Sequence, residues 1–557
     1  TFGQDSFQQI QTANRHFEER EFILAIKFYK NALDAKGSDI AFAHYQLGEC
    51  YRNLLDYATA EYHYQQAVAL KDRKLPFANF YYASMLKQNG KYEQALPVFE
   101  TFIEEIPSYF EDNKNARTFY NQSKNEREGC ILALTALSTP KPEYNLAALP
   151  SPINTDNNDY AATFYGSEDE IYVTSARKAK KGAVQDYSLG EYYTDFYGFR
   201  NSGGKWTSLK GKNLVDDVVN QKMGEGAGVF NRDKTRFYYT SCDQEGTICR
   251  IYVTTLENGK WGEPRKLGRS VNAPGTITKH PSLSPTGDTL YFSSDRAGGA
   301  GLMDIWMSFS SDGINWSPPK NLGKEINTPM NELSPYFDGN TGKLFFSSNG
   351  HRGFGGYDIY LANGLSFDKM EIYNLGYPFN SNKDDVFGVF GKTKGFLSSN
   401  RSGGPGKFDI YGFDIGPSKR VIAEISVNPA IAGRNAMFSD DFEFESDRVT
   451  LIKDLVSITL AAKLQGVALI LPTNLQRFYN SLSIEDRGKI ERIVNSRYRR
   501  VTEEELNELE LENEYFFMTS SEANKEHIRH MATKYVEEAG LSNNIDYDSV
   551  DLAFLNL

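Results

Sequence analysis

The sequence predicts a multidomain chain with an all-α helical solenoid, then an all-β propeller, then a mainly α-helical C-terminal region. The central observation is a phrase that occurs five times, an aromatic-rich strand that ends in Ser and is followed by a turn. Its final Ser falls at positions 175, 241, 294, 348 and 399, so that the later copies lie 53, 54 and 51 residues apart. A fixed period of this size with short aromatic strands is typical of propeller blades. Residues 5–107 follow a helical period of 35, and the blade pattern stops before Pro417.

Length and charge limit the class of protein. A chain of 557 residues should form several domains, and its formal net charge of −12 argues against nucleic-acid binding. No apolar run reaches the roughly 18 residues that span a bilayer, so no transmembrane segment is expected. The sequence begins at Thr1 without a charged-then-apolar leader, and we expect that a signal peptide has been removed or that the sequence was trimmed.

Helical hairpins are predicted for the first domain, residues 1–137. Small residues recur every 35 positions, and an aromatic follows each of them four positions later: Ala25 and Tyr29, Ala60 and Tyr64, Ala95 and Phe99. This spacing resembles tetratricopeptide (TPR) repeats, in which the small residue lets two helices approach and the aromatic fills the space between hairpins. A further helix at about 114–137 should cap the solenoid.

The repeat frame predicts a partner-binding groove. It places ten side chains on the concave face: Phe42, Tyr45, Glu49, Arg52, Asn53, Phe77, Phe80, Ser84, Lys87 and Gln88. Grooves of this repeat type bind extended peptides or helices. The alternative is that these side chains pack within the solenoid or against its capping helix.

A linker and closing strand at 138–153 lead into the propeller, residues 144–416. A second phrase, Leu-Gly or a variant of it followed by an apolar residue and Asn, occurs with Asn at 154, 220, 272, 327 and 380. Its first copy precedes the first blade, and no copy follows the last one. Strand 144–149 should therefore complete the last sheet, which removes an exposed edge. Five blades are predicted, with six as the alternative.

Blade 1 carries an insertion of about ten residues between Ser175 and Asp195. It begins with four basic residues: Arg177, Lys178, Lys180 and Lys181. Long insertions often carry function, which predicts a binding loop. A solvated surface excursion is the alternative.

The cysteines and the Arg and Asp residues of the blades predict two kinds of cross-link, a disulfide and ion pairs. Cys242 and Cys249 flank the turn of the second blade and are placed to form a disulfide, which would indicate an oxidising compartment; the alternative is two unpaired thiols on adjacent strands. Cys50 and Cys130 lie in helical patterns and should be free and buried. The Arg residues that follow the Ser pair are expected to form ion pairs with the Asp that opens the next strand, and they are Arg296, Arg352 and Arg401.

Residues 417–557 change character. Val421 to Val427 alternates as one strand, and the rest is helical, with Phe478-Tyr479 and Phe516-Phe517 opening two similar amphipathic segments. Between these segments, Arg residues meet a Glu-rich stretch at 503–514, which indicates a solvated helical face.

Catalytic motifs are missing from the sequence. There is no G-x-S-x-G elbow, Walker loop or HExxH, and His527 and His530 have no third ligand nearby. We therefore predict no catalytic residue, no metal, no cofactor and no enzymatic activity. The alternative is a pair of acids in the central channel.

The order of a TPR-like solenoid and blades that contain SPTGDTLYFSS (284–294) and Asp-Ile-Tyr resembles periplasmic proteins with TolB-like propellers of the PD40 (WD40-like) type. The arrangement is similar to cell-envelope components of Bacteroidota associated with type IX secretion and gliding motility. The resemblance implies a periplasmic or outer-membrane-associated scaffold that binds other envelope proteins. The Asn-Leu-Ser series with a paired Arg that binds peptidoglycan in OmpA-like domains is not found, so peptidoglycan is the weaker expected partner.

The alternative function is a propeller hydrolase or carbohydrate-binding protein that acts on envelope glycan or peptide. Carboxylates converging on the channel would favour that alternative, and an apolar channel would favour the scaffold.

Overall fold

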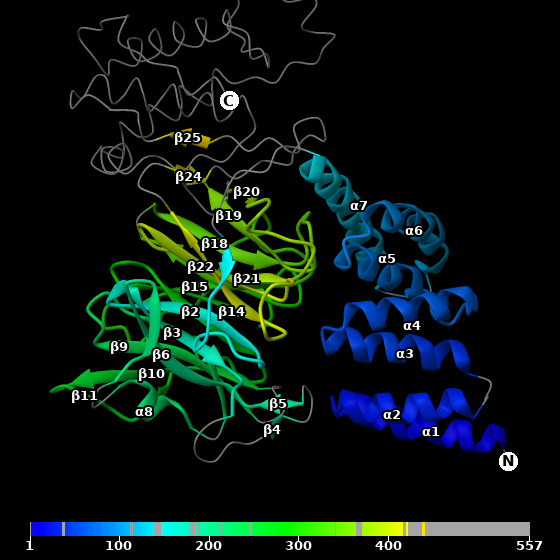
Figure 1. The fold of residues 1–557 in the computed structure, drawn as a ribbon, viewed down its shortest axis with the longest axis horizontal. Coiled ribbons are helices and arrows are strands. Elements are labelled where there is room, and N and C mark those ends of the chain that lie inside the picture. The colour runs from blue at the N-terminus through cyan, green and yellow to red at the C-terminus, as the bar shows by residue number, and fades with distance from the viewer. Residues whose placement is uncertain are drawn as a thin grey trace, which may run out of the picture. The chain divides into compact units, whose positions relative to one another are not determined.

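The computed structural model describes residues 2–35, 39–111, 113, 115–138, 146–178, 185–186, 190–210, 214–221, 223–243, 248–339, 341–363, 370–415, 419–421 and 437–439. The chain divides into two compact units, Thr1–Asp414 and Ile415–Leu557. The first unit contains both the helices and the propeller (Figure 1). No helix in the described residues is long and apolar enough to cross a bilayer.

Three antiparallel hairpins form the helical region. α1 (Phe2–Glu18) pairs with α2 (Phe22–Asp34), α3 (Ile40–Asn53) with α4 (Tyr57–Ala69), and α5 (Ala78–Gln88) with α6 (Tyr92–Glu105). The carboxylate of Asp56 accepts a hydrogen bond from the Thr59 amide and caps α4. A 3-10 turn, η1 (Ile106–Tyr109), leads to the long helix α7 (Ala116–Ser138), which packs on α5 and α6.

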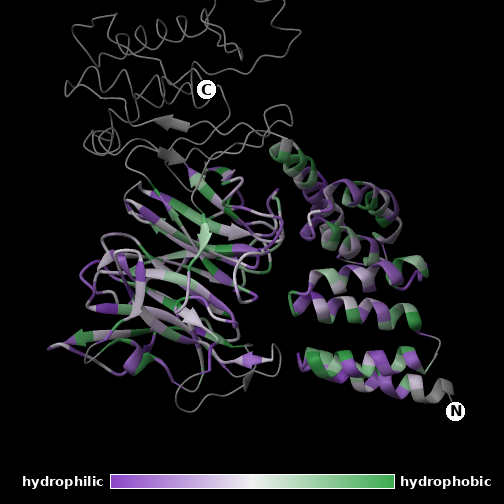
Figure 2. Ribbon diagram, in the orientation of Figure 1, coloured by the Kyte–Doolittle hydropathy of each residue, from purple (hydrophilic) through white to green (hydrophobic). Residues whose placement is uncertain are grey.

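The residues that recur every 35 positions form the helical core. Their side chains are all buried: Ala25, Tyr29, Ala60, Tyr64, Ala95 and Phe99. A Cβ atom on Gly48 would lie 2.8 Å from the ring of Tyr64, so the small residue permits the close approach of α3 and α4. In Figure 2 hydrophobic and hydrophilic stretches alternate along these helices, as expected where one face of each helix is buried.

Five sheets follow, and the prediction of five blades is confirmed. Blade 1 contains β2 (Asp159–Tyr165), β3 (Ser167–Ser175), β6 (Asp195–Ser202) and β7 (Lys205–Ser208), and blade 2 contains β8 (Gly224–Phe230), β9 (Arg236–Cys242), β10 (Cys249–Glu257), β11 (Lys260–Trp261) and β12 (Arg265–Lys266). Blade 3 contains β13 (Thr278–Leu283), β14 (Thr289–Ser294), β15 (Asp304–Phe309) and β16 (Lys320–Asn321), and blade 4 contains β17 (Glu332–Asp338), β18 (Lys343–Ser348), β19 (Asp358–Asn363) and β20 (Glu371–Asn374). Blade 5 contains β21 (Asp385–Phe390), β22 (Lys394–Ser399) and β23 (Asp409–Asp414).

Short elements complete this part of the chain. β4 (Gln185–Asp186) pairs with β5 (Glu191–Tyr192) in the insertion of blade 1, and α8 (Asp216–Val219) lies between blades 1 and 2. β1 (Ala147–Ala148) pairs antiparallel with β23 and is the fourth strand of the last sheet. A strand from before the first blade therefore closes the ring.

The inner strand of every blade contains the same irregularity. The pairing register shifts in β2, β8, β13, β17 and β21, and the third residue of each strand, or the fourth in β8, adopts a positive φ between 45° and 58°. These left-handed residues are Ala161, Ala227, His280, Ser334 and Phe387. Five bulges at equivalent positions bend the inner strands around the axis.

Hydroxyl groups tie neighbouring blades together at these bulges. The amide of Ala161 donates to Ser398 of the last blade at 3.0 Å, and the amide of Ala227 donates to Thr174 of blade 1 at 3.0 Å. The amide of His280 donates to Thr240 of blade 2 at 2.9 Å. In these three copies the hydroxyl of the first Ser or Thr of the pair accepts the inter-blade bond. In blade 4 the corresponding Ser347 bonds instead to Ser334 of its own blade.

Apolar layers fill the space between adjacent sheets. Between blades 2 and 3, for example, Tyr238, Phe292 and Trp306 belong to one buried cluster. Of the second unit, the structure describes one pair of strands, β24 (Lys419–Val421) with β25 (Met437–Ser439). The helical segments expected after residue 440, and most of the strand expected at 421–427, lie outside the described residues.

Candidate functional site

The two cysteines of blade 2 and the Ser, Asp and Arg side chains that recur with the blade period lie at one end of the five sheets. We call it the upper face, and define it as the end at which the second strands finish, at Ser175, Cys242, Ser294, Ser348 and Ser399. The third strands begin at the same end, because Asp195, Cys249, Asp304, Asp358 and Asp409 are the register partners of those residues.

The helical region binds the upper face over blades 4 and 5. The buried hydroxyl of Tyr57, at the start of α4, donates to the carboxylate of Asp384, just before β21. The amide of Asn400, just after β22, donates to the Tyr57 oxygen at 3.1 Å and to Asp384 at 3.2 Å. Tyr57 and Asp384 are 327 residues apart in sequence, so no local pattern links them.

α5 and α6 add contacts with the same two blades. The amide of Asn382 donates to the Gln88 carbonyl at 2.6 Å, and the Tyr92 hydroxyl donates to the Phe354 carbonyl at 3.1 Å. The ammonium group of Lys383 donates to Asn89 at 3.3 Å. Each of these residues lies at a loop or at the end of a helix, where the backbone leaves regular structure.

α7 lies along the β18–β19 loop of blade 4. The side chains of Gln122 and Asn125 donate to the carbonyls of Asn349, at 2.8 Å, and Gly350, at 3.1 Å. Glu128 forms an ion pair with Arg352. We call the contacts of Tyr57, Gln88–Tyr92 and α7 with residues 349–358, 382–384 and 400 the junction.

The structure places the ten predicted groove residues against the chain itself. Phe77 stacks on Phe119 of α7, with ring centroids 4.3 Å apart, and Phe80 is buried against the same ring. Ser84 bonds within its own helix. Tyr45 packs on Tyr64 and Tyr81, and Phe42 packs in the core of the first hairpins.

The polar members of that set also have partners within the chain. Glu49 accepts hydrogen bonds from Tyr64 and Arg52, and Asn53 bonds to the Glu49 carbonyl. Lys87 is buried and donates to Glu126 of α7 at 2.5 Å. Gln88 contributes to the junction through its carbonyl. The ten predicted residues thus lie near one another in the helical region, and α7 and the propeller cover much of the surface that they form.

Burial controls the charges at the junction. Desolvation raises the pKa of Asp358 to about 8. Burial opposes the charge of Lys87, but Glu126 and the other acidic groups around it raise the pKa of Lys87 above its ordinary value. Burial also raises the pKa of Asp384, and burial next to Asp384 raises that of Tyr57. At neutral pH the junction therefore holds a buried ammonium group beside carboxyl groups that ionise reluctantly.

The Arg residues after the Ser pair pin the connection that enters the blade in blades 1, 3 and 5. Arg401 donates to the Phe379 carbonyl at 2.6 Å and forms an ion pair with Asp385 at 2.5 Å. Arg296 donates to the carbonyls of Ser270 and Val271. The expected partner was the Asp that opens the third strand. The structure instead pairs Arg401 with the acid that opens the first strand, because the guanidinium reaches back across its own sheet.

Blade 4 departs from this arrangement. Its Ser348 is followed by Asn-Gly-His-Arg, and a ring nitrogen of His351 contacts the Ile326 carbonyl at 2.8 Å, the position that Arg occupies elsewhere. Arg352 is thereby released to meet Glu128 of α7. The departure in sequence coincides with the junction.

The basic insertion loop is described in part. Arg177 occupies the pinning position of blade 1, since it donates to the Ile153 carbonyl at 2.5 Å and forms an ion pair with Asp159 at 2.8 Å. Lys178 is exposed, with its ammonium group 5.9 Å from the centre of the Tyr192 ring. Lys180 and Lys181 lie outside the described residues.

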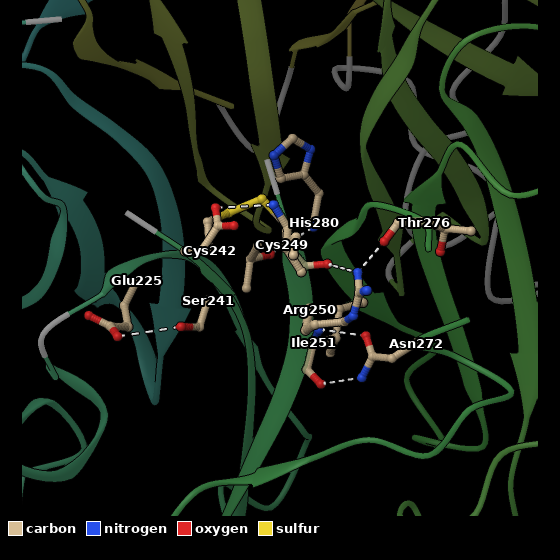
Figure 3. The surroundings of a disulfide bond; sticks show 12 residues. Glu225, Ser241, Cys242, Cys249, Arg250, Ile251, Asn272, Thr276 and His280 are labelled. Carbon is tan, nitrogen blue, oxygen red and sulfur yellow. Dashed lines mark hydrogen bonds between the residues drawn. A yellow bond between two sulfur atoms is a disulfide. The ribbon is translucent and has the colours of Figure 1, made fainter. Parts of the chain in front are cut away.

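The structure places a disulfide between Cys242 and Cys249 (Figure 3). The two residues face each other at the last register position of β9 and β10. Three other blades have Asp295, Asn349 or Asn400 at the position of Cys242, and each accepts a hydrogen bond from the connection into its blade. Blade 2 thus has a covalent link where those blades have polar pins. Cys50 and Cys130 are buried free thiols.

A cavity of about 50 Å³ lies on the propeller axis. Its lining comprises Ala161, Ala162, Thr163, Ala227, Gly228, Val229, His280, Pro281, Ser282, Ser334, Pro335, Tyr336, Phe387, Gly388 and Val389. No carboxylate occurs among these lining residues. Burial lowers the pKa of His280 well below its ordinary value, so its ring is neutral at pH 7 and Nδ1 accepts from the Ser334 amide at 3.3 Å. The space suits little more than a water molecule.

Four blades place an acid at the first or second position of the inner strand: Asp159, Glu225, Glu332 and Asp385. Asp159 and Asp385 pair with Arg, whereas burial raises the pKa of Glu225 and of Glu332 to about 8. Each acid also accepts a hydrogen bond from a backbone amide four residues earlier, as Glu332 does from Thr328 at 2.8 Å. These acids were not among the predicted site residues, although each lies five residues after the repeated Asn.

One group of possible metal ligands occurs in the described residues, at the turn between α1 and α2. It comprises His16, Glu19 and Glu21. The ring of His16 bonds to Glu21 at 2.5 Å, so an ion pair accounts for their closeness.

Apolar side chains are exposed on the upper face of blades 2 and 3. Met223 precedes β8, Ile248 precedes β10 and Leu302 precedes β15, with exposed fractions of 39%, 52% and 58%. Phe309 is 51% exposed at the opposite end of β15. Because Met223, Ile248 and Leu302 lie at one end of adjacent blades, these side chains are candidates for a protein-binding surface.

No protein-family model matches the chain, and no curated protein does. Among solved structures, a GH43_1 enzyme from Xanthomonas citri is 12% identical, with a TM-score of 0.34 over 56% of this chain and 96% of that one. The RS223 β-xylosidase is 13% identical, with a TM-score of 0.33 over 49% and 94%. A putative TolB from Agrobacterium tumefaciens is 11% identical, with a TM-score of 0.29 over 53% and 88%. Likenesses this slight carry no argument about mechanism.

These comparisons nevertheless correct one prediction. The prediction that the chain is not an enzyme is wrong. Several similar structures are named as glycosidases, among them the β-xylosidase and an α-L-arabinofuranosidase from Lactobacillus brevis. The missing sequence motifs belong to other catalytic classes and say nothing about paired acids on a propeller.

Proposed function

We propose that the chain is a scaffold of the bacterial cell envelope that binds protein partners of a secretion or motility assembly. The observation that carries the proposal is the half-covered upper face. Helices are fixed over blades 4 and 5, while Met223, Ile248 and Leu302 stay exposed over blades 2 and 3. A partner that binds there would meet three apolar loops beside the helical region.

Two further features support this proposal. The link between Cys242 and Cys249 suits an oxidising compartment such as the periplasm. The order of a TPR-like region and PD40-type blades resembles envelope proteins associated with type IX secretion and gliding. Peptidoglycan is the weaker expected partner.

A matched pair of variants tests the binding face. The full chain, carrying an affinity tag, is recovered from envelope fractions as wild type, as Ile248→Ser with Leu302→Ser, and as Phe309→Ser. Because Phe309 is as exposed as Leu302 but lies at the other end of β15, it controls for lost surface hydrophobicity. We expect the double variant to lose the co-purified envelope protein and Phe309→Ser to retain it. Equal recovery from all three proteins would remove the upper face from the proposal.

A second candidate function is glycoside hydrolysis, for which two of the buried inner acids are the candidate carboxyl groups. Burial raises the pKa of Glu332 to about 8, whereas Asp385 forms an ion pair with Arg401. Glycosidases use two carboxyl groups in different environments. Aryl xylosides and arabinofuranosides test it directly. The candidate requires turnover by the wild type that Glu332→Gln abolishes, with unchanged thermal stability. Lack of turnover on both substrate types would count against it.

A further inference from the structure

We propose that the junction is a releasable clamp, and that the propeller holds the helical groove in an autoinhibited state. The opened junction would expose Arg52, Lys87 and Gln88, on which a protein partner would then bind. This inference rests on the proposed scaffold function and adds a regulatory step to it.

The propeller occupies the end of the groove. A Cβ atom placed on Gly356 would lie 2.4 Å from the Gln88 amide nitrogen, so the β18–β19 loop touches that side chain. Asn382 satisfies the Gln88 carbonyl, and Asp358 lies close enough to Lys87 to raise its pKa. Two segments, one from blade 4 and one from the start of blade 5, thus occupy positions that a bound peptide would otherwise take.

The contact is polar, which makes it releasable. The described apolar clusters lie either in the helices or in the propeller, as the cluster around Tyr29 and the one around Phe346 do. Four buried polar atoms around the junction have no hydrogen-bond partner: Arg52 Nε, Gln88 Oε1, Arg127 Nε and Asp358 Oδ1. Each unpaired buried group destabilises the closed junction, and water or a partner would satisfy it on opening. Polar interfaces between parts of a chain resemble transient protein interfaces.

The sequence of blade 4 is adapted to this contact. A Cβ atom on Gly129 of α7 would lie 2.3 Å from the Gly353 carbonyl, so both partners approach as glycine backbones. His351 takes the pinning role of Arg, which frees Arg352 for Glu128. The equivalent loop of blade 3, residues 295–303, forms no hydrogen bond with a helix in the described structure and keeps the usual Arg296 pin.

Amide hydrogen exchange of the full chain tests the clamp. The peptide 349–357 lies under the helices, and 295–303 is its counterpart of the same length. The opening variant combines Tyr57→Phe with Asn382→Ala, and the control is Tyr64→Phe, which removes a buried hydroxyl bonded to Glu49 away from the propeller. We expect exchange of 349–357 to rise at least tenfold in the opening variant alone, while 295–303 stays unchanged.

Other outcomes overturn the proposal. Unchanged exchange of 349–357 would show that the junction does not open, and an equal rise in both loops would indicate unfolding of the propeller. The protein captured through the upper face should also bind the opening variant at least threefold more tightly, and equal affinity would refute autoinhibition. Failure to capture a protein would instead contradict the scaffold function, which separates the two tests.

Discussion

The side-chain amide of Asn154 forms two hydrogen bonds with the backbone of Ile410, from which it is separated by 256 residues. Its nitrogen donates to the Ile410 carbonyl at 2.9 Å, and its oxygen accepts from the Ile410 amide at 2.9 Å. The same pair of hydrogen bonds joins Asn220 to the backbone of Phe196 and Asn272 to the backbone of Ile251, in two of the other connections between blades. The ring is thus closed by the device that links its consecutive blades.

Replacing Asn154 by Ala should lower the free energy of unfolding by about 2–3 kcal/mol, because it leaves two buried backbone groups of Ile410 unpaired. Chemical denaturation followed by circular dichroism measures the loss. Asn201→Ala, near the end of β6 where the side chain accepts a bond from the exposed Gly204 amide, is the control and should change stability less than Asn154→Ala does. A loss for Asn154→Ala no larger than for the control would contradict the closure role.

The disulfide should stabilise blade 2. Its two cysteines are seven residues apart, and closing so short a loop constrains the unfolded chain by about 2.5 kcal/mol. The double variant Cys242→Ser with Cys249→Ser should lose about that amount, and reductant should destabilise the wild type equally. Cys50→Ser with Cys130→Ser shows how far reductant acts through other thiols. A mass map without reductant that shows both blade 2 cysteines free would refute the link.

Glu225 should make stability depend on pH. Burial raises its pKa in the folded state from 4.5 to about 8. The carboxyl group's contribution is therefore complete below about pH 4.5 and is lost as the pH rises toward 8, because only the unfolded chain releases the proton over that range. The stability of Glu225→Gln relative to wild type should rise by up to about 4 kcal/mol between pH 4.5 and 8. Glu263→Gln, at an exposed site, should show no such trend.

Gly129→Ala tests the close approach at the junction. The added methyl group would meet the Gly353 carbonyl at 2.3 Å, so α7 must shift or the loop must detach. We expect a loss of about 1–3 kcal/mol and faster exchange of the amides at 349–357. Gly268→Ala, where a Cβ atom meets nothing within 4 Å, is the matched control. Equal behaviour of the two variants would show that the helix and the loop do not touch.

The sequence predicted those structural features whose residues recur at a fixed interval along the chain. The blade period and the buried Ala and aromatic positions, such as Ala60 and Tyr64, recur at fixed intervals and are confirmed as core. The junction has no such signal, because Tyr57 and Asp384 occur once each and are far apart in the chain. The expected pairing of Arg401 with Asp409 was wrong, since the periodicity fixes the position of a side chain but not which strand it reaches. The guanidinium of Arg401 reaches Asp385 of the first strand instead.

The pairing of β1 with β23 has a mechanical consequence. Ala147 faces Gly412 and Ala148 faces Tyr411 in an antiparallel register, so residue 146 and the chain beyond residue 412 leave the sheet from the same end. A pulling force applied between those two points loads the strand pair one rung at a time, and the seam unzips rather than shears. The ring should therefore open at this seam under tension long before any of its blades unravels.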